Sequence, residues 1–129
     1  MKAAGATAGL VNASGDISTW GKPPKADVWK IGVAHPRKSA GVAKIIALKE
    51  EAVTTSGSYE KYAEVNGKRY SHIINPKTGM PSTGLVSATV VGPSAEFANA
   101  LSTSVMVLGK RKGKRLVRKF KDYKCYVIK

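Results

Sequence analysis

The chain has 129 residues, of which 43% are hydrophobic, and its 22 Lys and Arg against 8 Asp and Glu give a net charge of +14. This length suits one domain, expected over residues 1–129, and no apolar run approaches the roughly 20 residues of a membrane span. The charge favours an anionic partner, such as nucleic acid, a membrane surface or a phosphate-bearing ligand, without choosing among them.

Three short strands are predicted in the first half of the chain, at residues 9–13, 28–34 and 44–48. Each is rich in β-branched residues and is bounded by Gly, Pro or Ser. Residues 20–27 contain a Pro pair that enforces an extended loop, too short to separate domains. The first ten residues form a weak alanine-glycine run with one lysine, so no secretory signal is predicted.

A β-hairpin is predicted around Asn66 and Gly67, because both residues tolerate the positive φ of a two-residue type I′ turn. The facing pairs in that register are Val65 with Lys68, Glu64 with Arg69, and Tyr62 with Ser71. His72 then lies near the end of the second strand. Residues 84–92, rich in Val and Thr and poor in charge, predict a central strand.

The pattern becomes helical after Ser94, which is a suitable N-cap. Apolar residues recur three or four apart up to Gly109, which predicts the end of this helix; they are Phe97, Leu101, Val105 and Leu108. A second helix is predicted at 113–121 and a last strand at 124–128, where Cys125 is interpreted as a small buried side chain. Together the elements predict an α+β fold, a mixed or antiparallel sheet with two helices packed on it.

Two segments beside the predicted strands carry small and hydroxyl residues that suit phosphate or ribose oxygens. Gly15 and Asp16 follow the first strand, and Thr55, Ser56 and Gly57 precede the hairpin. Ordinary turns favour the same residue types. Both interpretations stay open from these residues alone.

The stretch RYSHIINPKTGMP, residues 69–81, combines a histidine with a turn rich in Pro and Gly. His72 is therefore either a hydrogen-bonded structural residue or a ligand contact and proton-transfer group. On the helix, Asn99 and Thr103 are one turn apart, and such a pair of oxygens suits Mg²⁺ as well as an ordinary polar surface. The eight Lys and Arg at 110–121 indicate a solvated face, with nucleic-acid binding disfavoured because no aromatic platform accompanies the charge.

Four stretches, taken in order, resemble successive motifs of the FAD:protein FMN transferases, the family once labelled thiamine biosynthesis lipoproteins. They are GLVNASGDISTWG, WKIGVAHP, AVTTSGSYEKYAEVNGKRYSHIINPKTGMP and SAEFANALSTSVMVLG. The resemblance covers nearly the whole chain. Its most specific part is the order and spacing of TSG, RYSHIINPKTG and the helix that carries Asn99.

The resemblance implies an FAD-binding α+β fold and a reaction that uses Mg²⁺ to split FAD at its pyrophosphate. FMN is joined through a phosphoester to a threonine hydroxyl of a target flavoprotein, and AMP is released. The FAD contacts that it implies are Gly15, Asp16, Thr55, Ser56, Gly57, His72 and Ile73, with His72 also catalytic. The metal ligands that it implies are Asn99 and Thr103.

Departures from the family pattern support a second hypothesis, a degenerate flavin-nucleotide-binding or structural module without transferase activity. Asn99 stands where the family has an aspartate, Ser14 replaces the first position of a Gly-Gly-Asp-like loop, and Asn75 replaces the aspartate of an HIIDP motif. The resemblance also begins about halfway along family members, so a second copy of the chain or an upstream half is expected to complete the site. A basic nucleic-acid binder is the third hypothesis, and the localisation stays open.

Overall fold

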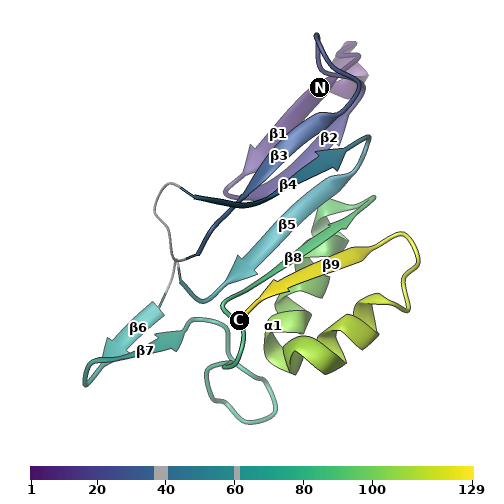
Figure 1. The fold of residues 1–129 in the computed structure, drawn as a ribbon. Helices are drawn as coiled ribbons and strands as arrows, with labels where there is room; N and C mark the ends of the chain where they lie inside the picture. Colours follow the sequence, from purple (N-terminus) through teal and green to yellow (C-terminus); the bar gives the residue numbers. More distant parts are fainter. Residues whose placement is uncertain (37–40, 60–61) are drawn as a thin grey trace.

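The main sheet of the protein has five strands in the order β1-β2-β5-β8-β9, and every neighbouring pair is antiparallel (Figure 1). Its strands are β1 (Gly9–Ala13), β2 (Asp16–Trp20), β5 (Ala52–Gly57), β8 (Ser87–Gly92) and β9 (Lys124–Ile128). The computed structural model describes residues 1–36, 41–59 and 62–129, and a single 3₁₀ turn, Lys2–Ala4, precedes β1. The predicted strands at 9–13, 84–92 and 124–128 are therefore confirmed, the second with a later start.

One face of this sheet is covered by the helix α1 (Ala95–Val117). All six residues of β8 are buried, which confirms its central place. Because side chains alternate along a strand, Val90 packs on the helix side, in a core that includes Leu101, Val105 and Met106. Val91 points to the other face.

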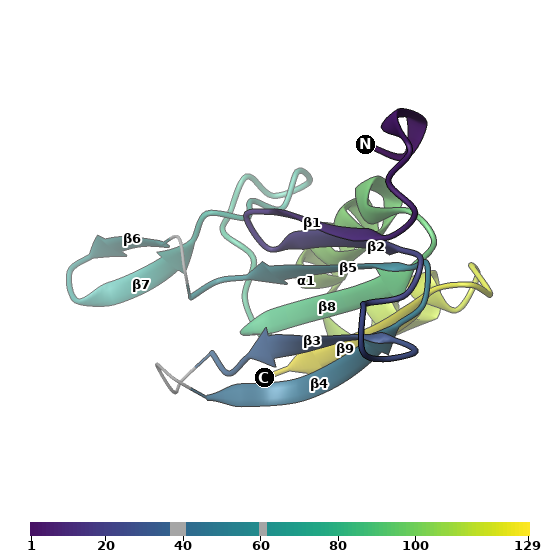
Figure 2. The same cartoon turned by 90° about the horizontal axis from the view of Figure 1, so that it is seen from above.

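The other face is covered by a second, separate hairpin, β3 (Trp29–Ala34) with β4 (Val42–Leu48). Ile31, Ile46 and Leu48 of this hairpin pack against Val53 and Val91 of the main sheet. Figure 2 shows the resulting order of helix, sheet and hairpin. The α+β class is confirmed, and the strands predicted at 28–34 and 44–48 form this hairpin, not part of the main sheet.

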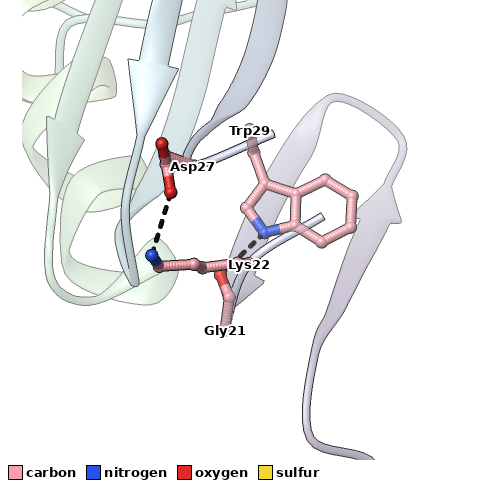
Figure 3. Close-up of polar contacts among 4 residues, drawn as sticks. All are labelled: Gly21, Lys22, Asp27 and Trp29. Carbon is pink, nitrogen blue, oxygen red and sulfur yellow. Dashed lines mark hydrogen bonds and ion pairs between the residues drawn. The ribbon is translucent and has the colours of Figure 1, made fainter. Parts of the chain in front are cut away.

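The loop between β2 and β3 is tied to the strand that follows it (Figure 3). The Trp29 indole Nε1 donates to the Gly21 carbonyl at 3.1 Å, and Lys22 Nζ lies 2.9 Å from Asp27 Oδ1. Both charged side chains are largely exposed, so this ion pair contributes little to stability. The indole bond holds the start of β3 next to the end of β2.

The two predicted helices form one element, α1, which continues to Val117 through a kink at Gly109, where the backbone is not helical. Ser94 caps the helix as predicted, its side chain accepting from the Phe97 amide at 3.2 Å. Gly109 has φ 74 and ψ 171, a conformation that favours glycine, and the helix resumes beyond it. Glycine at this position therefore turns the helix where the sequence pattern predicts a stop.

The part of α1 beyond the kink packs back on the part before it. A Cβ at Gly113 would lie 2.8 Å from Val105 Cγ1 and 2.9 Å from Val105 Cα, so only glycine allows this approach. Val105 and Val117 are both buried in the helix-side core. The two segments of α1 are thus fixed relative to each other.

Replacing Gly113 by Ala tests this contact, because the clash and the helix propensity of alanine change the free energy of unfolding in opposite directions. Propensity alone favours alanine by about 1 kcal/mol, whereas a clash with the Val105 backbone costs about 1–3 kcal/mol. We expect the clash to dominate, so that chemical denaturation gives a lower free energy of unfolding. Lys112→Ala, at an exposed neighbouring position, should stay within about 0.5 kcal/mol of the wild type. A Gly113→Ala variant more stable than the wild type would contradict the packing.

Two members of the predicted apolar stripe of the helix lie outside the core. Leu101 and Val105 are buried, but Phe97 is 38% exposed and Leu108 is 43% exposed. The Phe97 ring packs edge-on against Phe120 and Tyr123, with ring centroids 4.9 and 5.2 Å away. The kink and these aromatic contacts replace the straight stripe that the spacing predicts.

The hairpin β6 (Tyr62–Val65) with β7 (Lys68–Ser71) projects from the body of the protein (Figure 1). Asn66 and Gly67 have φ 51 and 71, as a type I′ turn requires. All three predicted facing pairs are present in the register. Arg69 Nε lies 3.6 Å from Glu64 Oε2, and its guanidinium lies 4.4 Å from the Tyr62 ring centroid. The hairpin prediction is confirmed.

Candidate functional site

A pocket of about 460 Å³ lies where β2, β5, the segment after β7 and the first half of α1 meet. Its lining is mostly small, polar residues from four distant parts of the sequence. The lining residues are Ser14, Asp16, Thr55, Ser56, Gly57, His72, Ile73, Ile74, Asn99 and Thr103.

The turn between β1 and β2 brings Asp16 to this pocket. Ala13 pairs with Asp16, so Ser14 and Gly15 form a two-residue turn, and both have positive φ. The Gly15 amide donates to Asn12 Oδ1 at 2.8 Å, which closes the turn. Gly15 is therefore part of a hairpin turn, and Asp16 is the first residue of β2. The signal was the Ser-Gly dipeptide between two β-rich runs.

Asp16 is joined to the helix by a direct hydrogen bond. The Asn99 Nδ2 donates to Asp16 Oδ2 at 2.8 Å. An amide that donates through its nitrogen keeps its carbonyl oxygen as an acceptor. The pair therefore presents a carboxylate and an amide oxygen together, although 83 residues separate the two side chains.

The end of β5 adds a group of hydroxyls. Ser56 Oγ lies 2.7 Å from Ser102 Oγ and 3.1 Å from Thr103 Oγ1, while Thr55 Oγ1 lies 2.9 Å from Thr89 Oγ1. Thr55, Ser56 and Gly57, for which a turn is one of the two predictions, are thus the last part of the central strand β5. The β-branched run AVTT was the signal for it.

The wall opposite is the segment after β7, where His72 is exposed and Ile73 is buried. Beyond it, Asn75 organises a compact loop. Its amide donates to the Met80 carbonyl, its carbonyl accepts from the Thr78 and Gly79 amides, and its side chain accepts from the Lys77 amide. An Ile74–Pro81 bridge and a Ser82 amide bond to the Ile73 carbonyl hold the loop ends together. This loop fixes the segment that carries His72.

Eight of the nine predicted site residues line this one pocket. The ninth, Gly15, lines an adjoining pocket of about 200 Å³ that shares Ser14, Thr55 and Gly57 with the first. Ser14 and Ile74, which are not among the predicted contacts, also line the site. Ser102, which hydrogen bonds Ser56, is not among the predicted ligands.

The donor set fits Mg²⁺ better than a transition metal. Within residues 1–36, 41–59 and 62–129, no group of three or more His, Cys, Asp or Glu is placed to hold a metal. Asp16 supplies one carboxylate, and Asn99 and Thr103 add neutral oxygens. Mg²⁺ is commonly held by one or two carboxylates together with water and substrate phosphates. The negative charge that Asn99 lacks is thus present on its neighbour Asp16.

Cys125 lies in β9, apart from the pocket, and is partly buried. Burial raises the pKa of its thiol, and the nearby charge of Lys114 opposes this rise. A thiol with a raised pKa is a weak nucleophile at neutral pH. The structure therefore gives Cys125 no part in this site.

Comparison with known proteins decides which family carries this arrangement. The model of the ApbE family matches residues 1–127. This chain belongs to the ApbE family. The chain is 37% identical over 121 residues to the FAD:protein FMN transferase of Escherichia coli and 36% identical over 113 residues to that of Haemophilus influenzae. The resemblance to this transferase family is confirmed.

Solved structures of ApbE proteins have the same fold. The crystal structure of the Thermotoga maritima ApbE protein matches with a TM-score of 0.83 and 38% identity, over 93% of this chain and 39% of that one. The apo form of the Pseudomonas stutzeri flavinyl transferase ApbE matches with a TM-score of 0.75 and 34% identity, over 99% and 43%.

The match to the curated ApbE relatives covers only part of their length. The alignments cover 92% of this chain but 34% of the Escherichia coli protein, and 85% of this chain but 33% of the Haemophilus influenzae protein. The chain therefore spans about a third of these relatives. Among the residues that the structure describes, no helix is long and apolar enough to cross a membrane.

Proposed function

We propose that this chain takes part in an Mg²⁺-dependent transfer of FMN from FAD to a threonine of a target flavoprotein, with release of AMP. The observation that carries the proposal is the convergence of Asp16, Ser56, His72 and Asn99 on one pocket. The names of the ApbE relatives, FAD:protein FMN transferases, supply the reaction class.

The residues of the pocket match the needs of this transfer. The threonine hydroxyl attacks the phosphorus of the FMN half, the bond to the bridging oxygen breaks, and AMP leaves with that oxygen. The hydroxyl must lose its proton, and His72 is the histidine in the pocket lining. His72 is exposed, as a base must be when the acceptor is a side chain of another protein.

Asp16, Asn99 and Thr103 are proposed to hold the Mg²⁺, which when bound would offset the negative charge of the diphosphate. The Ser56 hydroxyl and the Thr103 hydroxyl lie 3.1 Å apart, which keeps both oriented toward the same wall. Thr55, Gly57, Gly15 and Ile73 complete the proposed FAD contacts. A fixed polar wall of this kind positions the phosphates before the acceptor arrives.

The alternative is a flavin-nucleotide-binding or structural module without transferase activity, favoured by the three departures at Ser14, Asn75 and Asn99. One incubation separates the two, with FAD, Mg²⁺ and a target domain that bears the acceptor threonine. In-gel flavin fluorescence on the denatured target is the expected result. FAD that is retained by the chain but never becomes covalent on the target would support the module instead.

The third candidate is binding of nucleic acid through the basic residues. The salt dependence of binding distinguishes it from the other two candidates. Binding to a phosphate backbone weakens steeply as the salt concentration rises, because the release of counterions then contributes less free energy. We expect weak binding of single-stranded or duplex probes at physiological salt. Tight binding with a steep salt dependence would favour this candidate over the other two.

A further inference from the structure

The second part of α1 and the end of the chain carry a concentration of positive charge that the proposed function does not use. Residues 110–121 contain eight Lys and Arg, whereas the only acidic residue in α1 is Glu96, in its first turn. Like charges this close repel one another. The electrostatic repulsion between these side chains is reduced when an anion binds among them.

These charges are held on a rigid part of the fold. The Gly113–Val105 contact and the burial of Val117 fix the segment after the kink against the core. The Phe97–Phe120 pair ties the end of this segment to the start of the helix. A site built on such a fixed element is preorganised, which lowers the entropic cost of binding.

A pocket of about 530 Å³ lies on this segment, between the kink, Gly84 and Lys129. It is lined by five cationic residues and two glycines, and by no acidic side chain. The lining residues are Gly84, Gly109, Lys110, Arg111, Lys114, Arg118 and Lys129. Lys110, Arg111, Lys114 and Arg118 take part in none of the ion pairs found among the described residues.

This basic pocket is separate from the candidate site. The two share no lining residue. On α1, Asn99 and Thr103 lie before the kink at Gly109, and the basic residues lie after it. A ligand in the basic pocket would therefore leave the diphosphate site open.

We propose that the basic pocket binds a multiply charged phosphate, carried either by a small soluble polyphosphate or by an anionic lipid headgroup. The planar guanidinium groups of two arginines can each donate two hydrogen bonds to phosphate oxygens, and the ammonium groups of the lysines add positive charge. Lys110, Arg111, Lys114 and Arg118 together carry more positive charge than a single monoanion needs. The pocket of about 530 Å³ has room for more than one phosphate group.

The first arm of the test titrates the full chain with inorganic tripolyphosphate at physiological salt and measures heat by calorimetry. The variant Arg111→Gln with Arg118→Gln removes two charges from the pocket. Its control, Lys25→Gln with Lys30→Gln, removes two charges from exposed positions that line none of the pockets described above. We expect the pocket variant to bind at least about 10-fold more weakly, and the control to stay within about 2-fold, since charge-assisted bonds are strong.

The second arm repeats the comparison by flotation with phosphatidylcholine vesicles that contain cardiolipin, whose headgroup carries two phosphates. If the pocket variant loses binding to tripolyphosphate but not to the vesicles, the ligand is a soluble phosphate. If it loses binding to the vesicles but not to tripolyphosphate, the ligand is a lipid headgroup. Losses in both arms assign the phosphate chemistry without preference for its carrier. The proposal is overturned if neither probe binds, or if the pocket variant and the control lose binding equally. Thermal unfolding of both variants checks that they remain folded.

Discussion

Replacing His72 by Ala is expected to lower the rate of FMN transfer by about 10²–10⁴-fold, the usual contribution of a general base. His72 lines the diphosphate pocket, and its exposed position allows a protein acceptor to reach it. The rate is measured as covalent flavin on the target at saturating FAD and Mg²⁺. Under these conditions a mere loss of FAD affinity would not lower the rate.

His35 provides the matched control for this substitution. It is the other histidine of the chain, it follows β3, and it lines no part of the pocket. His35→Ala should leave the rate of transfer within about 2-fold of the wild type, as is usual for changes away from the chemistry. Equal rates for His72→Ala and the wild type would remove His72 from the mechanism.

Asn99→Asp is expected to have two opposite effects, because the new carboxylate faces Asp16. Asn99 Nδ2 and Asp16 Oδ2 are 2.8 Å apart, so in the absence of metal the variant replaces a hydrogen bond by two like charges. We expect a loss of about 1–3 kcal/mol in the free energy of unfolding with a chelator present. Added Mg²⁺ should restore this stability and bind about 10-fold more tightly than to the wild type.

Asn66→Asp adds the same charge in the exposed turn between β6 and β7, on the hairpin that projects from the body of the protein, at a position that does not line the pocket (Figure 1). Its Mg²⁺ affinity should match that of the wild type. Denaturation curves with chelator and with Mg²⁺ measure both variants. An Asn99→Asp variant whose affinity for Mg²⁺ is unchanged would contradict the placement of the metal beside Asn99 and Thr103.

Local chemistry was enough to predict the elements whose signals lie within a few residues. The Asn66-Gly67 turn fixed its hairpin register, and Ser94 marked the start of the helix. By contrast, β2 and β5 were missed because Ser, Thr and Gly at their ends suit loops as well as strand ends. Gly109 was recognised as a break, but whether a helix stops or turns there depends on the Gly113–Val105 contact, which no local pattern contains.

The candidate site was predicted largely by resemblance to a family, since its residues lie far apart in the sequence. Neither periodicity nor spacing relates Asp16 to Asn99, and their hydrogen bond follows only once β2 and α1 are packed on the same sheet. The loss of the family aspartate at Asn99 was therefore interpreted as a loss of charge. The structure places the Asp16 carboxylate beside it, which the sequence alone could not reveal.

The most direct measurement of the central claim is a titration of the isotope-labelled chain with FAD and Mg²⁺, followed by NMR. If the pocket holds the FAD diphosphate, the largest shifts will be those of the Asp16 and Ser56 amides and of the Asn99 side-chain amide. These chemical shift changes should reach their full size only when FAD and Mg²⁺ are both present. Shifts confined to the basic residues after Gly109, or the same shifts with FAD whether or not Mg²⁺ is present, would contradict the account.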